Sequence, residues 1–110
     1  EIAIAPHTSE IEEAKKIESI IIMKNNKSLN IMELAGLISK ASYVIANDTG
    51  PAHMAAHLGK MGVALFGHHT TAKKVSIETN KFKVISKDNL NSLSAETVYL
   101  EIEDKLKLIN

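Results

Sequence analysis

The sequence predicts an α/β fold in which a parallel β-sheet is covered by helices on both faces. Two observations lead to this prediction. Short runs of β-branched and aliphatic residues recur along the chain, and segments with apolar residues at helical spacing separate them. Strands buried on both faces are typically continuous apolar runs, and parallel neighbours need a crossover, usually a helix. With right-handed crossovers the domain is expected to be Rossmann-like.

The expected strands of this sheet are runs that end at Pro, Gly or polar turns. Residues 82–85 are expected to form a shorter, partly exposed strand, whereas residues 68–79 suggest only a loop with one helical turn. The main strands are expected at residues 2–5, 20–23, 43–46 and 63–66.

The helices between these strands have residues typical of helix ends. Acidic side chains favour the first turn of the helix expected to run to about Ile17, and Pro51 fits the first turn of the third helix. The last helix is expected to bury Val98, Ile102, Leu106 and Ile109. The residues expected to cap or end the helices are Ser9, Asn30 with Glu33, Gly59 and Ser94.

Composition excludes several classes of protein. The formal net charge is zero, so nothing favours nucleic acid or an anionic membrane as a partner. The absence of Cys excludes disulfides and thiolate zinc sites, and no apolar run approaches the ~20 residues of a transmembrane segment. The 110 residues, without repeat or linker, are expected to form a single, incomplete domain over 1–110 of a longer protein.

The most informative segment runs from Tyr43 to His53. An apolar run ends at Asn47-Asp48-Thr49-Gly50, and a helix is expected to follow. A strand, a tight turn and a helix N-terminus direct free backbone amides and the positive end of the helix dipole to one point, which suits phosphate. Neither the dinucleotide fingerprint nor the P-loop spacing occurs. The residues alone therefore predict an anionic, nucleotide-like ligand beyond the carboxyl ends of the strands.

Residues 47–56, followed by 63–67, resemble the C-terminal domain of the ADP-heptose:lipopolysaccharide heptosyltransferases of glycosyltransferase family 9. The helix at 30–38 and the acidic helix start at 10–16 are also similar, so the resemblance extends over nearly the whole chain. Its most specific part is Asp-Thr-Gly-x-x-His at 48–53 with the later Phe66-Gly67. The resemblance implies a GT-B enzyme of two Rossmann-like lobes, of which this chain is most of the C-terminal lobe.

The resemblance also implies a function. The chain would be the donor-binding lobe of a glycosyltransferase that moves heptose or a related sugar from a nucleotide-sugar, ADP-heptose, to a lipopolysaccharide core acceptor without a cofactor. The acceptor and the catalytic base would belong to the other lobe, so no catalytic residue is expected here and the chain alone should not transfer sugar. The protein would be cytoplasmic, or peripheral at the inner membrane through that lobe. A non-catalytic nucleotide- or phosphate-binding module remains the alternative.

The resemblance assigns donor contacts to individual residues. The turn amides would bind the diphosphate, Asp48 would face sugar hydroxyls, and His53 would donate to a phosphate oxygen. Glu10 would accept from the ribose hydroxyls, and Leu29 would bracket the adenine. The implied donor-binding residues are Asp48, Thr49, Gly50, Pro51, His53, Glu10 and Leu29.

Structural roles are open for the same residues. Asp48 could cap the next helix, Gly50 could permit a positive φ, Glu10 could be a first-turn acid, and Leu29 could belong to the core. A metal site is a further alternative, because two His are spaced i, i+4. We expect no bound metal, since position 54 is Met and only His68 or His69 offers a third ligand. The i, i+4 pair is His53 and His57.

Overall fold

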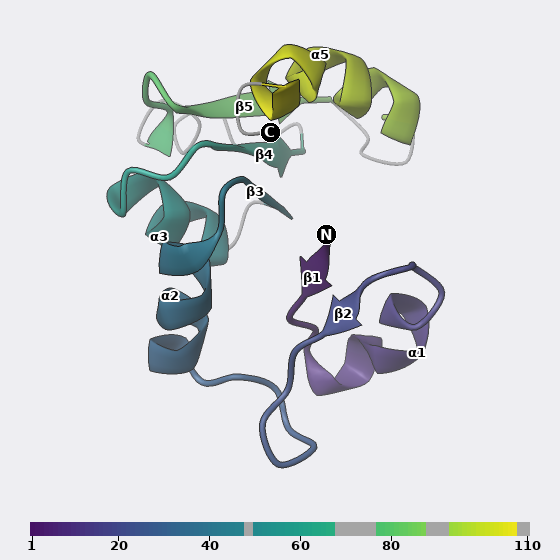
Figure 1. Cartoon of the computed structure of the whole chain (residues 1–110). Helices are drawn as coiled ribbons and strands as arrows, with labels where there is room; N and C mark the ends of the chain where they lie inside the picture. The colour runs from purple at the N-terminus through teal and green to yellow at the C-terminus, as the bar shows by residue number, and fades with distance from the viewer. Residues whose placement is uncertain (48–49, 68–76, 88–92, 108–110) are drawn as a thin grey trace. The chain divides into compact units, whose positions relative to one another are not determined.

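The computed structural model describes residues 1–47, 50–67, 77–87 and 93–107 (Figure 1). The chain divides into two compact units, Glu1–Leu37 and Ile38–Asn110, and each is described by itself. The expectation of a single domain over 1–110 stays a prediction. The described elements, in chain order, are β1 (Ala3–Ile4), the 3₁₀ helix η1 (Thr8–Glu10), α1 (Ile11–Ala14), β2 (Ile20–Ile21), α2 (Ile31–Lys40), β3 (Val44–Asn47), α3 (Gly50–His57), β4 (Gly62–Phe66), β5 (Phe82–Ser86) and α5 (Ala95–Lys107).

The first unit contains a parallel pair, β1 and β2, connected through η1 and α1. Ala3 is in register with Ile20 and Ile4 with Ile21. Both strands are shorter than the expected runs at 2–5 and 20–23. Pro6, which is buried two residues after the end of β1, has no amide hydrogen for the ladder, which explains why the strand does not continue through it.

The expected helix cap at Ser9 is wrong, because Ser9 lies inside η1 and His7 is the N-cap. The Ser9 amide donates to His7 Nδ1 at 3.3 Å, and the His7 amide donates to Glu10 Oε1 at 3.1 Å. The following helix ends at Ala14 rather than near Ile17. Ile17 is 53% exposed, so a longer helix would gain little apolar burial from it.

The expected capping box at the start of α2 is confirmed. The Glu33 amide donates to Asn30 Oδ1 at 2.8 Å, and the Asn30 amide donates to Glu33 Oε1 at 2.9 Å. Two amides that the helix itself cannot pair are thereby satisfied, which fixes where the chain enters α2.

Asn30→Ala is expected to lower stability by about 1 kcal/mol, because the Glu33 amide loses its acceptor. For a chain of this size the melting temperature should fall by roughly 4–8 °C. Asn80→Ala is the control, since Asn80 is exposed and lies outside any helix or strand. Equal melting temperatures for Asn30→Ala and Asn80→Ala in a thermal scan would contradict the role of the cap.

The second unit is built on the parallel sheet β3-β4-β5, with β4 in the centre. Gly62 of β4 is in register with Val44 of β3 and with Phe82 of β5. Helix α3 contacts β3 and β4, and α5 lies across β5 in Figure 1. Parallel strands with helices on both sides give the α/β fold that the sequence predicts. The buried side chains of this unit are Ile38, Ala52, Ala55, Ala56, Val63, Ala64, Phe66, Ile77, Phe82 and Ile102.

The described strands form two parallel sheets, β1-β2 and β3-β4-β5, where the sequence predicted one sheet. The apolar runs correctly identify where strands occur. They do not identify which strands become neighbours, because pairing depends on tertiary contacts that periodicity does not encode.

The ends of the helices in the second unit follow the sequence prediction. Gly59 has a φ of +70° and ends α3. The Lys60 amide donates to the Ala55 carbonyl at 3.0 Å and the Gly59 amide to the Ala56 carbonyl at 3.1 Å, the two bonds of a Schellman motif. Ser94 caps α5 by accepting from the Thr97 amide at 3.0 Å.

The apolar stripe of α5 is partly confirmed. Ile102 is buried, and Val98 and Leu106 are partly buried. Ile109 lies outside the described residues, as do residues 68–76 of the stretch expected to be a loop with one helical turn. In the described part of the chain, no helix combines the length and the apolar character that crossing a bilayer requires.

Candidate functional site

The turn predicted to bind an anion lies between β3 and α3 of the second unit. β3 ends at Asn47 and α3 begins at Gly50, whereas Asp48 and Thr49 lie outside the described residues. Pro51 is the second residue of α3, where an amide would have no partner within the helix. The sequence of strand, turn and helix therefore agrees with the prediction on both sides of the turn.

Gly50 does not need the conformational freedom of glycine in this structure. Its φ does not fall in the left-handed region, and the described glycine with a positive φ is Gly59. The alternative that Gly50 permits a positive φ is therefore wrong. A Cβ added to Gly50 would meet no described atom within 4 Å, so the described neighbours do not require glycine at this position.

His53 is the fourth residue of α3, and His57 is its last residue. His53 is partly buried in the first half of the helix, near the end where backbone amides lack helical partners, whereas His57 is exposed and is the last residue. No group of His, Cys, Asp or Glu suited to hold a metal occurs among the described residues, which do not include His68 and His69. The expectation of no metal stays a prediction.

In the first unit, Glu10 and Leu29 belong to the segments that leave the carboxyl ends of β1 and β2. Those ends meet at one edge of a parallel pair. The hydroxyls of Thr8 and Ser28 lie 3.1 Å apart and link the two segments next to Glu10 and Leu29. Glu10 is exposed and Leu29 is partly buried. Their assignment to the donor stays a prediction, but the structure does bring their segments together.

Glu10 also has the structural role that the sequence left open. Its Oε1 accepts from the His7 amide in the cap of η1. A carboxylate has about four lone-pair sites, so this bond leaves capacity to accept from ribose hydroxyls as well. Capping and donor binding are therefore compatible for this residue.

The segment between β2 and α2 contains a tight turn with its own backbone hydrogen bonds. The Lys24 amide donates to the Lys27 carbonyl and the Lys27 amide to the Lys24 carbonyl, each at 3.0 Å. Asn25 and Asn26 have φ values of +52° and +63°, which fit the type I′ turn that Asn tolerates. The Asn-Asn pair was the signal for this turn in the sequence.

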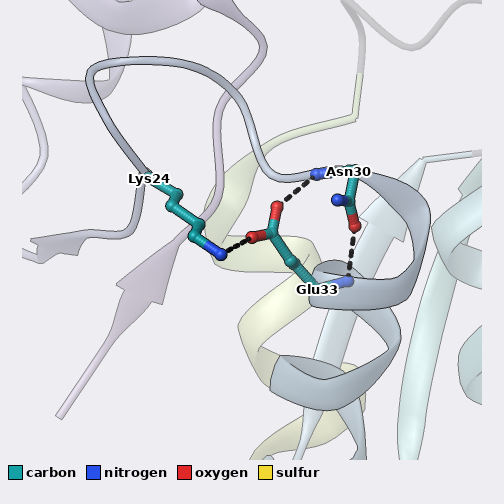
Figure 2. Close-up of polar contacts among 3 residues, drawn as sticks. All are labelled: Lys24, Asn30 and Glu33. Carbon is teal, nitrogen blue, oxygen red and sulfur yellow. Dashed lines mark hydrogen bonds and ion pairs between the residues drawn. The ribbon is translucent and has the colours of Figure 1, made fainter.

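Lys24 also reaches the capping box of α2 (Figure 2). Its Nζ lies 3.0 Å from Glu33 Oε2, on the oxygen that does not accept from the Asn30 amide. The Asn30 amide, and then Lys24, lower the pKa of Glu33. Because the folded state has the lower pKa, this stabilisation is present above the ordinary glutamate pKa and is lost as the pH falls through the lowered value.

A parallel α/β fold with polar turns beyond its strand ends defines a class of ligand-binding, Rossmann-like domains. Comparison with protein-family models identifies the family: residues 5–104 match Glycosyltransferase family 9 (heptosyltransferase). The match covers most of the chain, and the chain therefore belongs to glycosyltransferase family 9. Comparison with curated proteins and with solved structures gave no match. The family is one of glycosyltransferases, so its activity is the transfer of a sugar from a donor to an acceptor.

Proposed function

We propose that this chain is the donor-binding lobe of a glycosyltransferase that transfers heptose, or a related sugar, from ADP-heptose to a lipopolysaccharide core acceptor. The observation that carries the proposal is the family match over residues 5–104. The end of β3 at Asn47 and the start of α3 at Gly50 support it, because a helix N-terminus that soon follows a strand favours a diphosphate.

The diphosphate would be bound at the N-terminus of α3. No described atom lies within 4 Å of a Cβ added at Gly50, and the first-turn amides of α3 carry the positive end of the helix dipole. In this proposal Thr49 and His53 donate to phosphate oxygens, and Pro51 shapes the first turn. Asp48 accepts from sugar hydroxyls, since a carboxylate beside a diphosphate needs donors to offset the repulsion.

The nucleoside would be bound by the first unit. Glu10 would accept from ribose hydroxyls, and Leu29 would contact the adenine with apolar surface. Their linked segments at the edge of the β1-β2 pair support this part of the proposal.

The reaction would be a direct displacement. A base of the other lobe would take the proton from the acceptor hydroxyl, whose oxygen forms a bond to the anomeric carbon of the donor sugar. The bond from that carbon to the diphosphate oxygen breaks, and nucleoside diphosphate leaves. This chain would stabilise the leaving group with the fixed dipoles at the start of α3, and the reaction needs no cofactor. The full protein would act in the cytoplasm or at the inner membrane.

The proposal is tested by Asp48→Ala and His53→Ala in the full-length protein. Each should weaken ADP-heptose binding about ten- to a hundredfold, because each loses a hydrogen bond to a charged group or a sugar hydroxyl worth roughly 1.5–3 kcal/mol. Affinity is measured by calorimetry and stability by thermal unfolding on the same samples. His57→Ala is the matched control, since His57 lies on the same helix but is exposed at its far end.

Gly50→Val extends the same test. It should weaken donor binding at least as much by blocking close approach of phosphate, with little effect on melting temperature, because no described atom lies within 4 Å of the new Cβ. If Asp48 only caps α3, Asp48→Ala should lower stability by about 1 kcal/mol and leave affinity unchanged. Unchanged affinity in folded Asp48→Ala and His53→Ala proteins would end the proposal.

A further inference from the structure

We propose that Lys24 and Glu33 are positioning residues that hold segment 24–29 so that Leu29 meets the nucleobase of the donor. The inference rests on the proposed function, in which a nucleotide-sugar is bound, and it assigns a role to an ion pair that the proposed chemistry does not use.

Leu29 is flanked by anchored residues on both sides. Before it, the Ser28 hydroxyl lies 3.1 Å from the Thr8 hydroxyl. After it, the Asn30 amide donates to Glu33 Oε1 at 2.9 Å. Leu29, whose side chain is partly buried, therefore lies between two hydrogen-bonded residues, Ser28 and Asn30.

Glu33 connects the second of these anchors, Asn30, to Lys24 at the start of the segment. Its second oxygen, Oε2, lies 3.0 Å from Lys24 Nζ, so one carboxylate holds both Lys24 and Asn30 (Figure 2). The Asn30 side chain in turn accepts from the Glu33 amide at 2.8 Å. The capping box therefore orients the carboxylate independently of Lys24. As a result, the Glu33 side chain loses little further conformational entropy in the ion pair.

The exposure of the Lys24–Glu33 ion pair indicates that it positions segment 24–29 more than it stabilises the fold. The Lys24 side chain is 67% exposed and the Glu33 side chain 24% exposed. Ion pairs so close to solvent contribute little to stability. A loop that is already held in its binding conformation, however, loses less entropy when the ligand binds. The effect of the pair should therefore appear in nucleotide affinity while the melting temperature stays nearly constant.

Substitutions at the two positions separate the ion pair from the cap. Glu33→Gln keeps an acceptor for the Asn30 amide, since Gln also serves in capping boxes, but removes the charge that holds Lys24. Lys24→Met removes the other partner and leaves the cap intact. Lys24→Arg should restore wild-type behaviour. Lys27→Met is the matched control, because Lys27 pairs with Lys24 across the turn through backbone atoms alone among the described contacts.

The readouts are the affinities for ADP and for inorganic pyrophosphate, with the melting temperature of each variant. Glu33→Gln and Lys24→Met should weaken ADP binding about two- to fivefold, the range that a surface ion pair supports, and leave pyrophosphate binding unchanged. Lys24→Arg and Lys27→Met should bind both probes like the wild type.

Two results would overturn the inference alone: wild-type ADP affinity in both ion-pair variants, or an equal loss for ADP and pyrophosphate. A wild-type protein that binds no ADP would instead overturn the proposed function, and the inference with it. The two failures are therefore distinguishable in one set of titrations.

Discussion

Gly62→Ala is expected to destabilise the chain by about 3 kcal/mol, the upper part of the range for overpacking. The new Cβ would overlap the Val44 carbonyl oxygen and lie 2.8 Å from Phe82 Cε2. Neither neighbour can move freely. Val44 belongs to β3, paired with β4, and Phe82 has 0% exposure in the core. Relief of the clash would require the paired strands to separate or Phe82 to leave its site.

The matched control is Gly36→Ala. Gly36 lies in the interior of α2, and no described atom is within 4 Å of its added Cβ. This substitution should stabilise the chain by roughly 0.5–1 kcal/mol, since Ala favours a helix over Gly. Urea denaturation of both variants measures the difference. A Gly62→Ala chain with the wild-type midpoint would show that β3 and β5 do not approach β4 as closely as described.

Phe66→Ala should destabilise the chain by about 3–5 kcal/mol, the usual cost of truncating a buried aromatic side chain. Phe66 is fully buried and is the last residue of β4, the central strand. Its loss leaves a cavity in a core that is otherwise rich in small side chains, including Ala52, Ala55 and Ala64. Those side chains cannot extend to fill the space.

The control for this prediction is Tyr99→Ala. Tyr99 is an aromatic residue of α5 that is 53% exposed, so its truncation should change stability by no more than about 0.5 kcal/mol. Urea denaturation is again the measurement. A loss of stability for Phe66→Ala no larger than for Tyr99→Ala would contradict the packing around β4.

Features that depend on neighbouring residues in the chain were predictable. The capping box of Asn30 and Glu33, the Gly59 helix end and the Ser94 cap each require residue types at fixed spacing, and all were found. The strand at 62–66 was predictable because an apolar run ends at Gly67.

Features that depend on distant parts of the chain were not predictable. The division of the strands into two sheets depends on which strands pair, and the link between Thr8 and Ser28 joins residues 20 positions apart. One local feature was also missed. His7, and not Ser9, is the N-cap, because an imidazole nitrogen can also accept from an amide, a role that the usual cap preferences do not include.

In the candidate site, too, local features were predictable and a long-range contact was not. The end of β3 and the start of α3 were predictable from their local sequence, whereas the ion pair of Lys24 with Glu33 was not, because nothing local requires it. The donor contacts themselves stay predictions, since no local rule tells a helix cap from a ligand contact at Asp48.

The measurement that tests the donor-binding proposal most directly is amide chemical-shift mapping during a titration of the ¹⁵N-labelled full chain with ADP-heptose. We expect the amides of Gly50, Ala52 and His53 at the start of α3 to shift, together with those of Glu10 and Leu29, while the amides of α5 do not. Shifts confined to α5, or no shift at the start of α3 when the donor is in large excess, would show that the donor does not bind at the N-terminus of α3.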